Sequence, residues 1–211
     1  MKNIKKIIYL LRKEVGKTTA VIWHPKPFFV LISTVLSQRN RDESTEKASK
    51  ALFKKYNTAK KLANAPIKSI EKLIYSTGFY KTKARRIKAI AKILVSKHKG
   101  KVPKDFNKLI KLPGVGRKTA NCVLVYAYQL PAIPVDTHVH RISNRIGIVK
   151  TKTPEKTELE LIRIIPKKYW IEVNELMVKH GQAKCLSRNP KCKICALNKV
   201  CSYGKKQISK R

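Results

Sequence analysis

Acidic residues are scarce in this chain, which has 12 Asp and Glu against 49 Lys and Arg and a formal net charge of +37. Most basic groups therefore lack an acidic partner within the molecule. The ion-pair networks of heat-adapted proteins need both signs of charge, so few of them can form here. Long apolar runs are missing as well. No segment approaches the roughly 18 residues of a membrane span, and the apolar stretch after the basic N-terminus is too short for a secretory signal.

The excess positive charge requires anions from outside the molecule. A nucleic acid fits best, because each neutralised phosphate releases condensed counterions. An anionic membrane surface and a simply solvated basic surface are the alternatives. With 211 residues and 43% hydrophobic side chains, the chain can form one large core or two small ones. We expect a cytoplasmic, nucleoid-associated monomer, in which five cysteines favour metal or redox chemistry over disulfides.

Helical periodicity dominates the sequence, and no alternating segment is long enough to nucleate a sheet, so we predict an all-α fold. Prolines mark two junctions, one at 23–27 and one at Pro131 and Pro134. Thr77-Gly78 is expected to end a helix with the glycine as a left-handed cap. The predicted helices are Ile4–Leu11, Phe28–Leu36, Glu43–Tyr56, Ile67–Ser76, Lys81–Lys97, Phe106–Lys111, Arg117–Ala127, Thr137–Ile146, Pro154–Ile165 and Trp170–His180.

One of these helices lies in a stretch without acids, which runs from Lys81 to Lys104. Three apolar residues share one of its faces: Ile87, Ile90 and Leu94. Four basic residues are expected to remain available to solvent: Lys83, Arg86, Lys92 and Lys97. The helix can lie near phosphate, although a solvated face is the more common outcome for such a run.

A glycine-rich turn, Leu112-Pro-Gly-Val-Gly, is followed by Arg117-Lys-Thr-Ala between two helical patterns. Gly114 and Gly116 allow positive φ angles and have no Cβ atom to hold a phosphate away. The amides at the start of the second helix and the helix dipole then favour an anion. An ordinary helix-to-helix turn with a glycine cap is the simpler interpretation.

Four cysteines near the end of the chain have the spacing Cys185-x6-Cys192-x2-Cys195-x5-Cys201. Four thiolates within seventeen positions can surround one metal centre, which is either an iron–sulfur cluster or a zinc ion. The fifth cysteine, Cys122, lies on an apolar helix and is expected to be a buried core residue.

The hairpin motif Leu112–Ala120, together with Val135-Asp-Thr-His138, resembles the helix-hairpin-helix DNA glycosylases of the endonuclease III type. The likeness covers nearly the whole chain. It also includes Phe28–Asp42, Thr77–Tyr80 with Lys83-Ala84, Asn144-Arg145, His180-Gly181 and the cysteine array.

The resemblance implies two helical domains flanking a DNA-binding cleft. Residues 21–130 would form a six-helix domain with the hairpin, and residues 1–20 and 131–211 an iron–sulfur domain. It also implies that a [4Fe-4S] cluster is held by Cys185, Cys192, Cys195 and Cys201.

In that family the residue at Lys118 is the amine nucleophile and the residue at Asp136 the essential carboxylate. An amine attacks only when uncharged, a form that burial or nearby cations such as Arg117 favour. By position alone, a phosphate ligand is the better interpretation of Lys118, and an N-cap of the following helix also fits Asp136. His138 is expected to be structural, and His140 a surface or packing residue.

A base inside a duplex must be rotated out before its glycosidic bond is reached, and the gap must be filled. The resemblance places the wedge at Gln38 or Arg39, and it places Asp42 near the lesion pocket. A helix cap is the alternative role of Asp42. The full set of predicted DNA-binding residues is Gln38, Arg39, Asp42, Leu112, Gly114, Val115, Gly116, Arg117 and Thr119.

The resemblance therefore implies a bifunctional glycosylase and abasic-site lyase that acts on oxidised pyrimidines in duplex DNA and also binds abasic sites. A mismatch or adenine glycosylase on the same fold is the rival enzyme. A DNA-binding module without catalysis is the rival from another class.

Overall fold

The computed structural model describes residues 3–16 and 26–209, and these residues form helices and no strand. The prediction of an all-α fold is confirmed. The predicted junction at 23–27 lies largely outside the described residues. Within the same two ranges, no helix is long and apolar enough to cross a membrane. The chain divides into two compact units, Ile22–Gln129 and a second unit made of Met1–Val21 with Leu130–Arg211.

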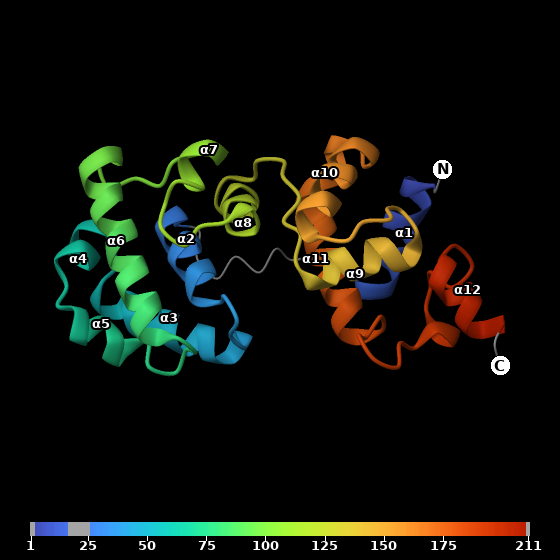
Figure 1. The fold of residues 1–211 in the computed structure, drawn as a ribbon, viewed down its shortest axis with the longest axis horizontal. Coiled ribbons are helices and arrows are strands. Elements are labelled where there is room, and N and C mark those ends of the chain that lie inside the picture. The colour runs from blue at the N-terminus through green and yellow to red at the C-terminus, as the bar shows by residue number, and fades with distance from the viewer. Residues whose placement is uncertain (1–2, 17–25, 210–211) are drawn as a thin grey trace. The chain divides into compact units, whose positions relative to one another are not determined.

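The unit Ile22–Gln129 is built around the long helix α6, which packs against α4 and α5, while α2 packs against α3 and α8 (Figure 1). Seven of the ten residues of α2 are buried. One of them, Phe29, stacks on Phe53 of α3 with ring centroids 4.0 Å apart. The helices of this unit are α2 Pro27–Leu36, α3 Asp42–Lys55, α4 Ala59–Asn64, α5 Ile67–Leu73, α6 Tyr80–His98, α7 Phe106–Leu109 and α8 Arg117–Tyr128.

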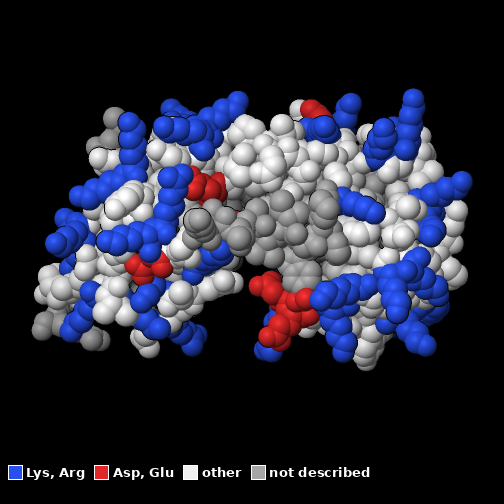
Figure 2. All heavy atoms as spheres, turned by 180° about the vertical axis from the view of Figure 1, so that it is seen from behind, with Lys and Arg blue, Asp and Glu red and all other residues white. Residues whose placement is uncertain are grey.

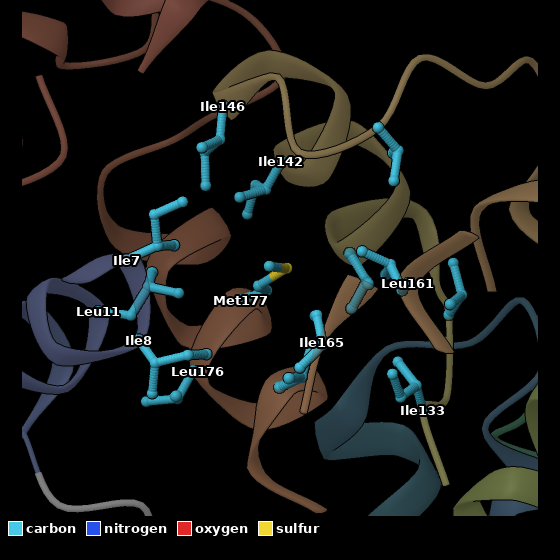
Figure 3. Packing of buried hydrophobic residues seen from close by; sticks show 14 of the residues in the cluster. Ile7, Ile8, Leu11, Ile133, Ile142, Ile146, Leu161, Ile165, Leu176 and Met177 are labelled. Carbon is cyan, nitrogen blue, oxygen red and sulfur yellow. The ribbon is translucent and has the colours of Figure 1, made fainter. Parts of the chain in front are cut away.

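The second unit joins the N-terminal helix to the C-terminal part of the chain. Figure 3 shows Ile8 and Leu11 of α1 beside Leu176 of α11, with Ile142 and Ile146 of α9 in the same cluster. This core fixes α9, the helix that follows Asp136. Its helices are α1 Ile4–Val15, α9 Thr137–Ile146, α10 Pro154–Ile164, α11 Trp170–Ala183 and α12 Ser202–Ser209, with the short 3-10 helices η1 Lys167–Tyr169 and η2 Cys192–Ile194.

Local sequence signals explain several helix ends. Thr153 caps α10 and Pro154 opens it, while Gly147 ends α9 in the left-handed conformation with φ +84°. Two short helices, α4 and α12, were not predicted. The prediction of a left-handed cap at Gly78 is wrong, because the positive φ of +58° falls on Phe79, at the start of α6.

Basic side chains cover much of the surface. Figure 2 shows Lys and Arg spread over the visible face of each unit, whereas Asp and Glu gather at a few spots. Ion pairs such as Arg12–Glu172 and Lys50–Glu46 engage few of the 49 basic residues. Much of the positive charge is therefore available to external anions.

Candidate active site

The predicted hairpin connects α7 to α8 through a tight turn. Leu112 and Val115 are buried, and their amides donate to the carbonyls of Leu109 and Leu112 at 3.0 and 3.1 Å. Gly114 has φ +75°, a conformation that favours glycine. Gly116 is the N-cap of α8 with φ −89° and ψ 179°, which is extended backbone. The expected positive φ therefore holds at Gly114 only.

The start of α8 offers backbone donors. Among the described residues, the amides of Gly114 and Gly116 have no hydrogen-bond partner, and no side chain caps the helix. Lys118 is exposed on the first turn. The guanidinium of Arg117 lies 4.8 Å from the centre of the Phe106 ring.

The predicted wedge loop is tied to the hairpin. Gln38 Nε2 donates to Gly114 O at 2.8 Å and to Thr119 Oγ1 at 3.3 Å. Arg39 has a left-handed backbone with φ +51°. Asp42 is the first residue of α3, whose N-cap is Arg41, so the alternative role of Asp42 as the N-cap is wrong. The structure brings Gln38, Thr119 and the hairpin together within one unit.

Helix α6 contacts the end of α2, just before this loop, through Lys83. The expectation that Lys83 is available to solvent is wrong, since the residue is 3% exposed and its Nζ donates to Leu36 O at 2.7 Å. Burial lowers the pKa of Lys83 from 10.5 to about 8. The bond places an ammonium group at the C-terminal end of α2, where the helix dipole favours a cation.

Phe79 is a candidate residue that the sequence did not single out. It is 66% exposed although it is apolar, and its backbone is left-handed. It lies beside the wedge loop, because the amide of neighbouring Gly78 donates to Asn40 Oδ1 at 3.3 Å. A strained, exposed aromatic residue next to a polar loop marks a functional surface. The only signal for this residue in the sequence was the stretch Thr77–Tyr80, which is part of the family resemblance.

Asp136 is the N-cap of α9, and its Oδ1 accepts a hydrogen bond from Val139 N at 2.8 Å. The capping role proposed from sequence is confirmed. The ring of His138 lies 3.1 Å from Arg141 Nη2, which also donates to the carbonyl of Cys185 at 2.9 Å. His140 is half-buried and lies 2.7 Å from Thr157 Oγ1, as expected of a packing residue.

All four cysteines of the array line one pocket of about 370 Å³, a volume that includes space open to solvent. All are free thiols. No group of three His, Cys, Asp or Glu within residues 3–16 and 26–209 is arranged to hold a single metal ion. Cys122 is buried on α8, outside this pocket, as predicted.

Arg145 holds the first part of the cysteine loop in place. Its guanidinium donates to Leu186 O at 2.6 Å, to Ser187 O at 2.8 Å and to Cys185 Sγ at 3.4 Å. Its other face lies 4.7 Å from the centre of the Tyr203 ring. These bonds fasten the part of the loop around Cys185 to α9.

Two of the thiols, those of Cys192 and Cys195, favour protonation. Burial raises the pKa of Cys195 to about 11, and burial together with neighbouring thiols raises the pKa of Cys192. His180 is buried beside Cys195, with Nε2 3.8 Å from Sγ, and burial lowers the pKa of its ring. A bound metal would therefore displace protons from this site rather than meet preformed thiolates.

The remaining geometric prediction concerns Lys118 and Asp136. Lys118 belongs to the unit Ile22–Gln129, and Asp136 to the unit that contains Leu130–Arg211. Their joint action on one nucleotide stays a prediction. The hairpin and wedge-loop residues Gln38, Arg39, Asp42 and Leu112–Thr119 all lie in the first of these units.

Comparison with known proteins gives concordant results. Residues 32–167 match the family model of the HhH-GPD superfamily base excision DNA repair proteins. Endonuclease III of Thermotoga maritima is 51% identical over 189 residues, which cover 88% of this chain and 89% of the relative. Endonuclease III of Escherichia coli is 34% identical over 95% of both chains.

Two solved structures are similar over almost the whole chain. A non-covalent endonuclease III–DNA complex aligns with a TM-score of 0.90 and 38% identity, covering 99% of this chain and 100% of that one. A trapped endonuclease III–DNA covalent intermediate aligns with a TM-score of 0.89, 38% identity and the same coverage.

Proposed function

The chain belongs to the endonuclease III family, within the HhH-GPD superfamily of base excision DNA repair proteins, and we propose on that basis that it is a bifunctional DNA glycosylase and abasic-site lyase. Its substrates would be duplexes that contain oxidised pyrimidines or abasic sites. We expect the protein to act as a monomer in the cytoplasm, in association with the nucleoid. We propose that its residues have the roles that the resemblance implies, with Lys118 as the nucleophile and Asp136 as the essential carboxylate.

The observation that carries this proposal is the similarity to a trapped covalent intermediate between an endonuclease III and DNA. A covalent intermediate needs a nucleophile on the protein. In this chain Lys118 is exposed on the first turn of α8, beside the two hairpin amides without partners. An amine at this place is next to a site for a phosphate of the same strand.

The chemistry begins with attack of the uncharged Lys118 amine on C1′ of the deoxyribose. The C1′–N bond breaks, and the base leaves with the bonding electrons and a proton. The nitrogen of Lys118 then forms a Schiff base with C1′ as the sugar ring opens. Removal of a proton from C2′ breaks the C3′–O bond and expels the 3′ phosphate by β-elimination. Water finally hydrolyses the imine and frees the lysine.

Asp136 is proposed to stabilise the positive charge that develops on the sugar and to relay protons. Its second role as the cap of α9 holds the carboxylate in a fixed orientation, because Oδ1 is already bonded to a backbone amide. Gln38 or Arg39 is proposed to fill the gap left by the extruded nucleotide. Exposed Phe79 is a further candidate for contact with the opened stack.

The cysteine pocket is proposed to hold a [4Fe-4S] cluster through Cys185, Cys192, Cys195 and Cys201. The support is the shared pocket, four soft sulfur donors and the membership of the endonuclease III family. When bound, the cluster would tie the C-terminal loop together, and the basic residues of that loop would meet the DNA backbone. Analysis for iron and inorganic sulfide tests this assignment, and stoichiometric zinc would refute it.

Reduction with borohydride tests the enzyme activity. Wild-type protein, a labelled duplex with one abasic site and sodium borohydride should give a covalent adduct, because hydride reduces the Schiff base to a stable amine. Lys118→Gln should give no adduct. Lys108→Gln is the matched control, since Lys108 is exposed on α7 of the same hairpin but is not part of the proposed chemistry.

The pattern of strand cleavage separates the rival functions. Duplexes with an oxidised pyrimidine should be cut without alkali by the wild type. Cleavage that appears only after alkali would indicate a mismatch or adenine type of glycosylase without lyase activity. Binding with neither adduct nor base release would leave a DNA-binding module.

A further inference from the structure

Arg86 lies against the hairpin although it belongs to α6, and this contact falls outside the family motif that identifies the hairpin. A Cβ atom placed on Gly114 would lie 2.7 Å from Arg86 Cδ and 3.2 Å from Nε. The stem of Arg86 therefore covers the Cα of Gly114. The left-handed φ favours glycine at position 114, and an added Cβ would also displace the Arg86 stem.

The guanidinium of Arg86 has no partner among the residues that the structure describes. Arg86 is exposed, and within residues 3–16 and 26–209 it makes no hydrogen bond or ion pair. Arg12 and Arg145 differ, because Glu172 binds the first and loop carbonyls bind the second. The packing of its stem thus brings five unused N–H donors to the hairpin.

The hairpin offers further donors at the same place. The amides of Gly114 and Gly116 have no partner among the described residues, and they stand at the positive end of α8. A phosphate in contact with these amides would lie next to the Arg86 side chain. A guanidinium binds two phosphate oxygens in parallel, which amides on one turn do less well.

We propose that Arg86 is a phosphate ligand of the DNA backbone, so that the hairpin's phosphate site combines backbone amides with a guanidinium from α6. The proposal rests on the proposed function, because it assumes that duplex DNA meets the hairpin. It deepens that function by assigning the site a residue from a separate helix.

The test compares Arg86→Met with Arg85→Met. Methionine keeps an unbranched stem over Gly114 and removes the charge. Arg85 is also exposed and without a described partner, but it is one residue and about 100° away around α6. The probe is a duplex that carries a tetrahydrofuran abasic-site analogue, and the measurement is the dissociation constant between 50 and 200 mM salt.

Loss of one phosphate contact reduces the slope of log affinity against log salt by about 0.9. When the salt concentration rises fourfold, the affinity of each protein falls by some factor. For Arg86→Met this factor should be about 3.5 times smaller than for the wild type. Arg85→Met should keep the wild-type slope. Equal slopes for Arg86→Met and the wild type would overturn the proposal. A wild type that neither binds the duplex nor forms the borohydride adduct would instead refute the proposed function.

A second measurement needs no variant. Phenylglyoxal modifies exposed arginines, and peptide mapping by mass spectrometry reports each one. In the wild-type protein, Arg86 should be modified when free and protected by the tetrahydrofuran duplex, whereas Arg85 should react in both states. Equal modification of Arg86 with and without DNA would overturn the proposal even if Arg86→Met does not fold.

Discussion

The substitution Lys83→Met removes a buried ammonium group and should remove a pH dependence with it. Lys83 is 3% exposed, and its Nζ donates to Leu36 O at 2.7 Å. Burial lowers the pKa of Lys83 to about 8 in the folded protein, from 10.5. Between these two values the unfolded chain holds a proton that the folded protein has released. The free energy of unfolding contributed by this group therefore rises with pH.

The size of the effect follows from the two pKa values. Each unit of difference corresponds to about 1.4 kcal/mol, so the full window from pH 8 to 10.5 is worth about 3 kcal/mol. Most of this change in the free energy of unfolding falls within an experimentally accessible pH range, since the change from pH 7 to 9.5 is about 2 kcal/mol. In a chain of this length that corresponds to a shift in Tm of about 4–8 °C.

Methionine fills nearly the same volume without a charge. At pH 7 the variant escapes the desolvation of the ammonium group but leaves Leu36 O without its donor, a loss of about 1–3 kcal/mol. The two effects nearly offset each other, so the stabilities at pH 7 should be similar. At pH 9.5 the wild type should be the more stable by about 2 kcal/mol.

Thermal melts of both proteins at pH 7 and 9.5, followed by far-UV circular dichroism, test this reasoning. The other lysines titrate in both proteins, so their contribution cancels in the difference between wild type and variant. The expected result is a difference in Tm that opens between the two pH values. A difference that stays constant with pH would show that Lys83 keeps its proton when folded and would refute the argument.

Three further predictions concern the other unit. Asp136→Asn should abolish glycosylase activity at nearly unchanged Tm, because asparagine caps helices as well as aspartate does. Asp136→Ala should lose the activity and also about 1 kcal/mol of stability. Equal Tm values for the two variants would contradict the capping role of Asp136. Iron retained against a chelator should fall as pH falls, because protons compete for thiols such as Cys195, whose pKa is raised to about 11; retention that is constant from pH 8 to pH 5 would contradict this. Gly181→Ala should cost about 1–3 kcal/mol in a urea melt, because the added Cβ would lie 2.3 Å from His138 Nδ1; wild-type stability would show that the ring moves freely.

The sequence predicted the helices well because periodicity reports which face is buried, and the failures have physical causes. Lys83 lies four residues before Ile87, on the same face as Ile90 and Leu94, so its burial follows the helical period. The error came from treating a lysine as exposed by type. Its partner, Leu36 O, is 47 residues away and has no sequence signal.

The prediction of the left-handed residue between α5 and α6 was wrong for another reason. Glycine is the residue that adopts this conformation without strain, so Gly78 was the natural choice. The structure instead places Phe79 there and holds Gly78 close to Arg39 O, 3.6 Å from where a Cβ would be. A Cβ at that distance would make an ordinary van der Waals contact, so this contact does not require glycine at position 78.

The hairpin illustrates how much of a site lies outside its motif. The motif contains Gly114, but the carbonyl of this residue accepts a hydrogen bond from Gln38, and its Cα is covered by Arg86. Replacing Gly114 would disturb its φ angle and the Arg86 contact, and through them the Gln38 bond, so reduced DNA binding by such a variant would have no single cause. Substitution of Gln38 removes its bonds to Gly114 O and Thr119 Oγ1, and substitution of Arg86 changes the contact with the Gly114 Cα; both keep the glycine that the turn needs. These two positions, rather than the glycine, therefore allow the contributions of wedge loop, α6 and hairpin amides to be separated.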